Sequence, residues 1–504
     1  MPRDTDTGRR ARRGGLRAAG RRVRANLGAT LVLMLMVVVE AFGLRTGALG
    51  EITIAAFGLL FAVLVFSRFS MVRLALLTTY AAAFTFTWNG WFVGPARPAD
   101  VLAILAVVLF TFAHSGGHLP RLPRWITQLV FTILAVLALN IIFRPNPEYL
   151  TQRIVLDQPG LSSPLAKKPF LSTNLSVAFK FIVATALVPL AFAFAATYRK
   201  EMARRLVVLF AVGSAVSGWV AFFGLYGITT LNRLTGLVAP GAPRQVGMAW
   251  QPNYLAAGVV LAVPVGIWLL VEKSTNSRWL GLFVTLGCVL GAYASGSRGG
   301  AVCVVGAVGI SILVIPNARK FAVPSFFVAI TAVNAIVLLV PDFGREILKA
   351  TRLVGASQVT DPSNQARSIA AAQAWRDFLH SPIHGIGYQV SFDAQTVYLQ
   401  LIQSGGLLIF AAMLVYNFGA VFSSWKMIRL DPLAAALCAS VLSSLALNIF
   451  EADITDRFYY VPIAAIVALR YVHFPPEPAP AEVVEPAPRR APWPAARRPL
   501  GALT

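Results

Sequence analysis

Residues 27–44, LGATLVLMLMVVVEAFGL, form an apolar run that decides the fold class of this chain. A helix needs about 17–25 predominantly apolar residues to cross the roughly 30 Å hydrocarbon core of a bilayer, and this run meets that length. An Arg-rich arm, residues 1–26, precedes the run, and a second apolar run follows at once. That context favours an uncleaved first membrane helix over a cleaved signal peptide.

Runs of similar length recur along the chain, of which 57% is hydrophobic and only 13% charged. A soluble protein keeps about a quarter of its residues charged, and a β-barrel would show short alternating segments instead. We therefore predict an all-α, polytopic integral membrane protein with about 14 transmembrane helices. The later runs are centred near residues 59, 82, 106, 135, 186, 217, 263, 287, 307, 331, 409, 441 and 465.

The connectors between the runs predict the orientation. If the first arm is cytoplasmic, every inward loop carries Arg or Lys, as the positive-inside bias requires. Both chain ends are then expected in the cytoplasm, in a multi-pass protein of the cytoplasmic (inner) membrane. The inward loops carry Arg68 with Arg73, Arg121 with Arg124, Arg199-Lys200 with Arg204-Arg205, Lys273 with Arg278, Arg319-Lys320 and Lys426 with Arg429.

Three domains follow from this reading: a basic cytoplasmic arm at 1–26, a transmembrane helical domain at 27–473, and a Pro/Ala/Arg-rich tail at 474–504 predicted to be disordered. The long loops fall outside, near 144–174, 229–253 and 341–396. Loops of that length are usually functional or disordered. The third contains Asp361-Pro362-Ser363, a plausible helix start, followed by Ile369, Ala372, Trp375 and Leu379 at helical spacing. We expect a short helix there with one apolar face at the membrane surface.

The net charge of +23 resides in the arm, the short loops and the tail, which favours a topogenic role over nucleic-acid binding. Cys288, Cys303 and Cys438 fall within apolar runs, where helix packing explains them better than disulfides or metal ligation. The chain shows no metal-binding motif and no phosphate loop. We expect no cofactor and no metal.

Two arginines near the predicted external face are candidate anion ligands. Arg298 stands in Ser295-Gly296-Ser297-Arg298-Gly299-Gly300, where small neighbours and a helix N-terminus suit a diphosphate. A snorkelling arginine in a tight turn explains the same residues. Arg244 stands shortly before Trp250-Gln251-Pro252-Asn253-Tyr254, which is either a plain helix start or a second cationic element of the same site.

The third loop adds Arg367 and then Pro382-Ile383-His384-Gly385-Ile386-Gly387-Tyr388, where the glycines permit a tight reversal. Asp393, in Asp393-Ala394-Gln395-Thr396-Val397-Tyr398-Leu399-Gln400, and His384 are the ionisable groups nearest the return to the membrane. Either could act as a general base, and either could be a solvated loop residue.

Three elements in this order resemble the O-antigen ligase and O-antigen polymerase superfamily of bacterial envelope glycosyltransferases, over roughly residues 230–420. They are Arg244 with Gln251-Pro252-Asn253-Tyr254-Leu255-Ala256; Ser295-Gly296-Ser297-Arg298-Gly299; and Arg367, Trp375, Pro382, Gly385-Ile386-Gly387, Tyr398-Leu399-Gln400 and Gly405. The resemblance implies transfer of a glycan from a polyprenyl-diphosphate carrier to an acceptor hydroxyl on a glycan or lipid, without a metal. Its partners would be that lipid-linked glycan, the acceptor and membrane lipid.

By resemblance, Arg298 and Arg244 would be catalytic, holding the donor diphosphate and stabilising the leaving charge, with Asp393 or His384 as the base. Arg367, Asn253, Gln395 and Tyr398 would contact substrate. The chain departs from the family at one position, where Gln395 and Thr396 replace the usual histidine followed by Asn. Glutamine is no base at neutral pH, so acceptor activation differs or falls to another residue.

Two further functions stay open from the sequence. A flippase or transporter of lipid-linked oligosaccharide would place its polar residues near the bilayer midplane along a repeat interface, whereas this chain gathers them at the external face. The second alternative function is that of a non-catalytic envelope assembly protein. Whether an enzyme of this kind would act as an O-antigen ligase or as an exopolysaccharide polymerase is not encoded in any motif we identify.

Overall fold

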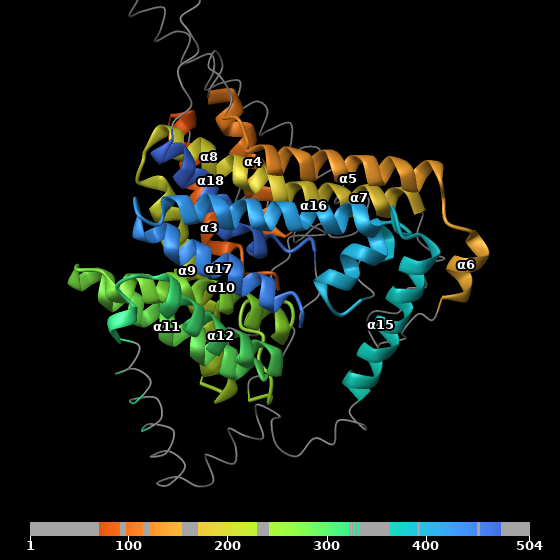
Figure 1. Ribbon diagram of the computed structural model, residues 1–504. Coiled ribbons are helices and arrows are strands. Elements are labelled where there is room, and N and C mark those ends of the chain that lie inside the picture. Colours follow the sequence, from red (N-terminus) through yellow and green to blue (C-terminus); the bar gives the residue numbers. More distant parts are fainter. Residues whose placement is uncertain are drawn as a thin grey trace, which may run out of the picture.

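The described part of the chain is helical throughout (Figure 1). A computed structural model describes residues 70–90, 97–113, 120–153, 170–228, 241–321 with 324, 327 and 331, and then 362–390, 394–450 and 454–474. The predicted arm, the first helix, the run near 59, most of the run near 331 and all but the first residue of the tail lie outside these ranges. Parts of the predicted external loops near 144–174, 229–253 and 341–396 lie outside them as well. Within the described ranges no strand occurs.

Six described helices are long and apolar enough to cross a membrane, and four shorter apolar helices accompany them. Each lies on a predicted run, which confirms an integral membrane protein; the total of about 14 spans stays a prediction. The six are α5 (Arg124–Ile142), α7–α8 (Phe170–Tyr198, with a π-helical turn at Val183–Leu187), α9 (Met202–Leu225), α10 (Pro252–Val271), α11 (Thr275–Ser295) and α16 (Val397–Met427). The four are α3 (Met71–Thr85), α4 (Pro98–Ala113), α12 (Arg298–Val314) and α17 (Pro432–Leu447).

Three further helices complete the described part of the chain. α6 (Pro147–Gln152) and α15 (Pro362–His380) lie in the predicted external loops, and α18 (Val461–His473) follows a 3₁₀ turn at Arg457–Tyr460. Start signals in the sequence explain several boundaries. α10 and α17 each begin at a proline, and the Asp431 side chain caps α17 by accepting from the Leu433 N–H. The predicted start of α15 at Pro362 is confirmed.

α10 is the central helix of one half of the bundle. Its residues from Leu255 to Leu269 are all buried, against α9, α11, α12 and α17. Small residues allow this close packing: a methyl group on Gly218 of α9 would lie 2.1 Å from the carbonyl oxygen of Gly287 in α11. In the other half, α5 contacts both α7 and α16, and the three run side by side (Figure 1).

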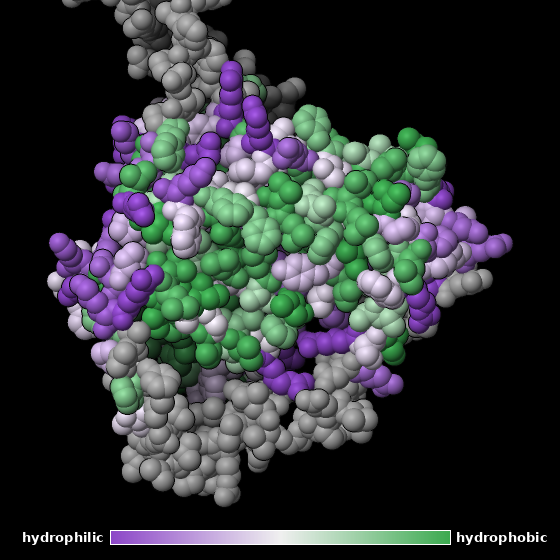
Figure 2. All heavy atoms as spheres, in the orientation of Figure 1, coloured by the Kyte–Doolittle hydropathy of each residue, from purple (hydrophilic) through white to green (hydrophobic). Residues whose placement is uncertain are grey.

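The predicted inward loops gather at one end of this bundle, which we call the basic end. Arg204, Lys273, Asn317 and Asp431, from four such segments, line one cavity. Hydrophilic side chains lie at both ends of the molecule in Figure 2, with a hydrophobic belt between them. α6 and α15 lie at the opposite end, and α15 runs across the direction of α5 and α16 (Figure 1).

α15 turns its apolar residues outward. Trp375 and Leu379 are 52% and 61% exposed, whereas Gln373 and Asp377 are buried on the inner side with Ala374. This is the reverse of a helix on a soluble core, and it agrees with an apolar face presented to the membrane surface. The buried polar residues on the other side need partners, which the site provides.

Candidate functional site

Arg244 joins three segments that are separate in the sequence. Its Nε donates to the carbonyl oxygen of Ser295 at 3.1 Å, and its Nη2 donates to Oδ1 of Asn253 at 3.0 Å. The backbone N–H of Gln245 donates to the Ala294 carbonyl at 2.9 Å, which fixes the same loop to the end of α11. Asn253, which the resemblance assigns to substrate contact, thus accepts from Arg244 in this structure.

The turn after Ser295 leads directly into α12, which begins at Arg298. Gly296 takes a left-handed conformation (φ 58°), which ends α11, and the Ser297 hydroxyl caps α12 by accepting from the Gly300 N–H. Arg298 is the first residue of α12 and is half-buried. The turn that Arg244 contacts is therefore the one that presents Arg298 at a helix N-terminus, where dipole and N–H groups favour an anion.

The two glycines after Arg298 allow the start of α12 to pack closely against other parts of the chain. A methyl group on Gly300 would lie 2.4 Å from the Ala256 Cβ of α10, and one on Gly299 would lie 2.8 Å from the Cβ of Phe450, just beyond α17. Both contacts require glycine, so the start of α12 is held tightly between α10 and the end of α17. This packing keeps the position of Arg298 well defined.

The third loop meets the membrane domain at a break in α16. Gly406 has φ 60° and ψ −158° inside this helix, which frees backbone groups on either side of it. The carbonyls of Gln403 and Ser404 accept from the N–H groups of Ile386 and Gly387 at 3.0 and 3.1 Å. The N–H groups of Leu407 and Leu408 donate in turn to the carbonyls of Pro382 and Ile383. The loop thus satisfies the broken helix, as buried backbone at this depth requires.

Glycine is needed on both sides of this junction. Gly385 and Gly387 have positive φ, 67° and 109°, which confirms the predicted tight reversal. A methyl group on Gly385 would lie 2.5 Å from the backbone nitrogen of Gly405, and one on Gly406 would lie 2.4 Å from the Ile383 carbonyl carbon. The Gly-Ile-Gly element and Gly405 are therefore parts of one backbone junction.

His384 lies on the α5 side of the loop. Its Nδ1 is 3.1 Å from Oδ1 of Asn140, whose Nδ2 donates to the His384 carbonyl at 3.1 Å. An amide oxygen only accepts, so Nδ1 is the donor in the bond to Asn140. In Figure 1, α5 and α12 lie on opposite sides of α16. The contacts of His384 therefore place it with α5 rather than with the Arg298 turn.

Three other predicted site residues lie on α15, just before α16 and at the start of α16. Arg367 is exposed on the first turns of α15, and Gln395 is half-buried just before α16. The hydroxyl of Tyr398 donates to the Leu445 carbonyl at 2.7 Å, which ties α16 to α17. Asp393 lies outside the described residues.

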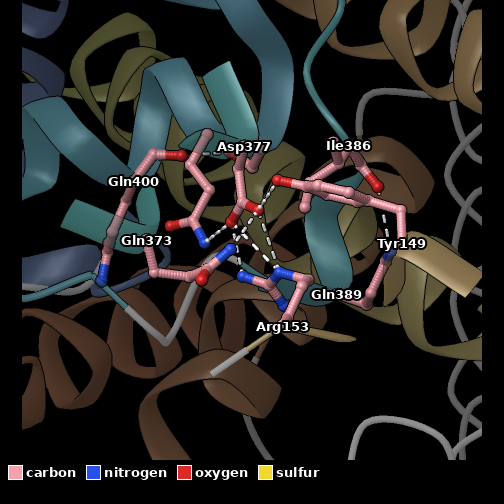
Figure 3. Close-up of polar contacts among 9 residues, drawn as sticks. Tyr149, Arg153, Gln373, Asp377, Ile386, Gln389 and Gln400 are labelled. Atoms are coloured by element: carbon pink, nitrogen blue, oxygen red, sulfur yellow. Dashed lines mark hydrogen bonds and ion pairs between the residues drawn. The ribbon is translucent and has the colours of Figure 1, made fainter. Parts of the chain in front are cut away.

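A buried polar cluster that the sequence analysis missed holds α15 in place (Figure 3). We call it the Asp377 clasp: Asp377, Tyr149, Arg153, Gln373 and Gln403. Arg153 donates from Nη2 to Oδ2 of Asp377 at 2.5 Å and from Nε at 3.0 Å to Oδ1. Tyr149, Gln373 and Gln403 donate to the same carboxylate at 2.8, 2.9 and 2.7 Å.

The clasp is structural in character. The Asp377 and Arg153 side chains are 0% and 2% exposed, and both oxygens of the carboxylate accept from donors of the clasp. A carboxylate buried and engaged in this way is closed to an acceptor hydroxyl. Burial, and then the bond to Asp377, raise the pKa of Tyr149 well above its usual range, so this phenol stays a donor. The clasp joins α6 and the residue after it to α15 and α16.

A second charged cluster lies beside the Arg244 loop. The Gly90 N–H donates to the Met248 carbonyl at 3.0 Å, and next to Gly90 the Asn89 side chain accepts from Arg457. Arg457 is almost fully buried and pairs with Asp100 at 2.6 Å, and Arg97 pairs with Asp456. These pairs connect α4, the start of α18 and the loop that carries Arg244.

The structure thus brings together Arg244, Asn253 and the Arg298 turn, and separately joins the His384 loop to α5 and α16. Sequence signals existed for part of what was missed: Asp377 and Gln373 interrupt the apolar spacing of the third-loop helix, which indicated a polar face. Among the described residues, no group of three or more His, Cys, Asp or Glu is arranged to hold a metal ion.

Comparison with known proteins agrees with this geometry. No curated protein matches the chain. Residues 281–408, however, match the family described as O-Antigen ligase. That segment runs from α11 through the Arg298 turn and α15 to the break in α16, and so it contains the second and third of the three predicted elements. The resemblance predicted from the motifs is confirmed over residues 281–408, the segment that matches the O-antigen ligase family.

Proposed function

We propose that this protein transfers a glycan from a polyprenyl-diphosphate carrier to an acceptor hydroxyl, with Arg244 and Arg298 at the donor diphosphate. The match to O-antigen ligases supports glycan transfer at the level of the family. The observation that carries the residue assignment is the Arg244 junction, since its bonds to Ser295 and Asn253 fix one guanidinium against the turn that bears the other.

The two arginines act on the leaving group. As the bond between the sugar and the diphosphate breaks, negative charge grows on the diphosphate oxygens. Cations already held in place stabilise that charge without reorganising at the moment of reaction. The bonds from Arg244 to the Ser295 carbonyl and to the Asn253 amide oxygen orient the guanidinium beside the turn that bears Arg298.

Activation of the acceptor falls to His384 or Asp393 in this proposal. His384 engages Asn140 through Nδ1, so Nε2 is the ring nitrogen that would take the acceptor proton. Its position beside α5 requires the acceptor to enter from that side of α16. Gln395 and Tyr398 would then contact the acceptor or donor sugar without transferring a proton.

The membrane arrangement supports reaction at the external face. The segments with Arg204, Lys273 and Asn317 share the basic end, and α6 and α15 lie at the other end. The positive-inside bias assigns the basic end to the cytoplasm, so the Arg298 turn faces outward from the cytoplasmic membrane. Both chain termini would be cytoplasmic in that orientation.

The test measures glycan transfer from a purified polyprenyl-diphosphate glycan by the full-length protein in proteoliposomes. Arg298→Ala is expected to lower transfer by about 100- to 1,000-fold, the usual effect of removing one stabiliser of developing charge. Arg298→Lys keeps the charge but not the planar fork, so it should recover only part of the activity. Unchanged transfer in Arg298→Ala contradicts the assignment.

A second readout separates transfer from transport. The same proteoliposomes report movement of a fluorescent lipid-linked oligosaccharide between leaflets. We expect no change in that movement when Arg298 is replaced. No transfer by the wild-type protein, accompanied by movement that Arg298→Ala abolishes, would establish the flippase alternative instead.

A further inference from the structure

Two adjoining cavities open at the basic end, far along the helices from the Arg298 turn. One holds about 470 Å³ and lies between the ends of α10, α12 and α17; the other holds about 800 Å³ and lies between α3, α9 and α11. Arg204 lines both. We call the two together the basic-end groove.

Arg204 is held in a fixed orientation at the junction of the two cavities. Its Nη2 lies 2.6 Å from the Glu272 carboxylate, and its guanidinium carbon lies 5.0 Å from the centroid of the Trp268 ring. A guanidinium has five N–H donors, and one carboxylate engages only some of them. The side chain is still half-exposed, so a second acceptor can reach it.

Below this polar rim the larger cavity is apolar. Val208 and Leu209 of α9 face it with Leu269 of α10 and Leu280 of α11, and the Ser277 hydroxyl lies on the rim. The wall therefore changes from charged and hydroxylic to aliphatic within a few helical turns. A phospholipid makes the same change from headgroup phosphate to acyl chain.

The surroundings of the groove carry net positive charge. The segments 199–205 and 272–278 contain six cationic residues and two carboxylates, and Asp431 adds a third carboxylate to the lining, which leaves a net charge of +3. An anionic headgroup is attracted by such a surface, and each nearby Lys or Arg contributes about five-fold in affinity. A basic segment of the chain itself would be repelled. The residues counted are Arg199, Lys200, Arg204, Arg205, Lys273 and Arg278 against Glu201, Glu272 and Asp431.

We propose that the basic-end groove binds one anionic phospholipid, with its phosphate at Arg204 and an acyl chain along Val208, Leu209 and Leu280. This site is separate from the proposed glycan transfer and does not depend on it. Its ligand comes from the leaflet at the basic end, the opposite one from the leaflet next to α15.

Native mass spectrometry of the delipidated full-length protein tests the proposal. Phosphatidylglycerol should bind at one site at least about five-fold more tightly than phosphatidylcholine. Arg204→Gln should remove most of that preference. The control is Arg319→Gln, a cation at the same end that donates to the Leu313 carbonyl and lines neither cavity; it should leave the preference unchanged.

Leu209→Trp provides an independent check, because it fills the apolar part of the groove and keeps every charge. It should weaken phosphatidylglycerol binding. If Arg204→Gln does not fold, the result with Leu209→Trp alone tests the proposal. Three results would overturn the proposal: equal binding of the two lipids, full binding by the Leu209→Trp protein, or displacement of phosphatidylglycerol by millimolar inorganic phosphate, which would indicate a phosphate site without lipid selectivity.

Discussion

Arg153 and Arg244 both lie toward the end of the helical domain opposite the basic end, but their surroundings differ. Arg153 is buried and paired with the Asp377 carboxylate, which also accepts from three other side chains. Arg244 is half-buried and donates to the Ser295 carbonyl and to the Asn253 amide oxygen. The first arrangement holds α15, and the second orients a partly exposed guanidinium beside the turn that bears Arg298. Burial thus separates an architectural arginine from the one that we propose for the diphosphate.

Breaking the clasp should have the largest effect. Asp377→Ala leaves Arg153 buried without its carboxylate, and loss of one partner of a buried ion pair costs about 3–5 kcal/mol. We expect a large drop in the free energy of unfolding, measured by denaturant titration in detergent. Arg376→Ala is the matched control, an exposed neighbour on the same helix, and should change stability little. Equal losses in the two variants would show that the clasp is not what holds α15.

Breaking the Arg244 junction should affect transfer more than stability. Arg244→Ala removes one cation from the proposed diphosphate site, so transfer should fall by about 100-fold or more, equivalent to about 2.7 kcal/mol or above. Unfolding should change by much less than in Asp377→Ala, because the lost bonds are partly exposed. Steady-state transfer assays and thermal unfolding in parallel test this. A loss of stability as large as that of Asp377→Ala would remove the distinction between the two arginines.

The junction between loop and helix offers a third test. Gly406→Ala places a side chain in a backbone conformation that is essentially restricted to glycine, at a cost of about 1–3 kcal/mol. Gly309→Ala in α12 is the control, since nothing lies within 4 Å of the added methyl group. It should be neutral or slightly stabilising, because alanine favours the helix. Thermal unfolding of both variants measures the difference.

Tyr149 should produce the smallest effect and a dependence on pH. Tyr149→Phe removes one neutral donor from the clasp and should cost about 0.5–1.5 kcal/mol. Because the pKa of Tyr149 is raised in the folded chain above the unfolded value of about 10, its contribution is complete below pH 10 and is lost as the pH rises further. The wild-type protein should therefore lose stability above pH 10 more steeply than Tyr149→Phe. Parallel slopes would contradict this.

Much of the fold was predictable from local signals. The apolar runs located the described membrane helices, Pro252 and Pro362 marked the starts of α10 and α15, and the glycines at 385 and 387 indicated the reversal. Such features depend on residues that are close together in the sequence, so hydropathy and helix start signals are enough to predict them.

The parts that were missed depend on residues that are distant in the sequence. Arg153 and Asp377 are 224 positions apart, and Asn140 and His384 are 244 apart. The break at Gly406 is stable only because the loop at 382–387 supplies its backbone partners. No local pattern encodes these pairings. The sequence analysis grouped Arg244, Asn253 and Arg298, and the structure joins Arg244 to Asn253 and to Ser295 in the turn before Arg298.

Binding of the donor carrier tests the central claim most directly. A purified polyprenyl diphosphate without glycan can be titrated into wild-type, Arg244→Ala, Arg298→Ala and Arg376→Ala proteins, each first shown to be folded. We predict that both site variants bind at least ten-fold more weakly and that Arg376→Ala binds like wild type. Undiminished binding by Arg244→Ala and Arg298→Ala would contradict the account, because the diphosphate would then be held elsewhere in the protein.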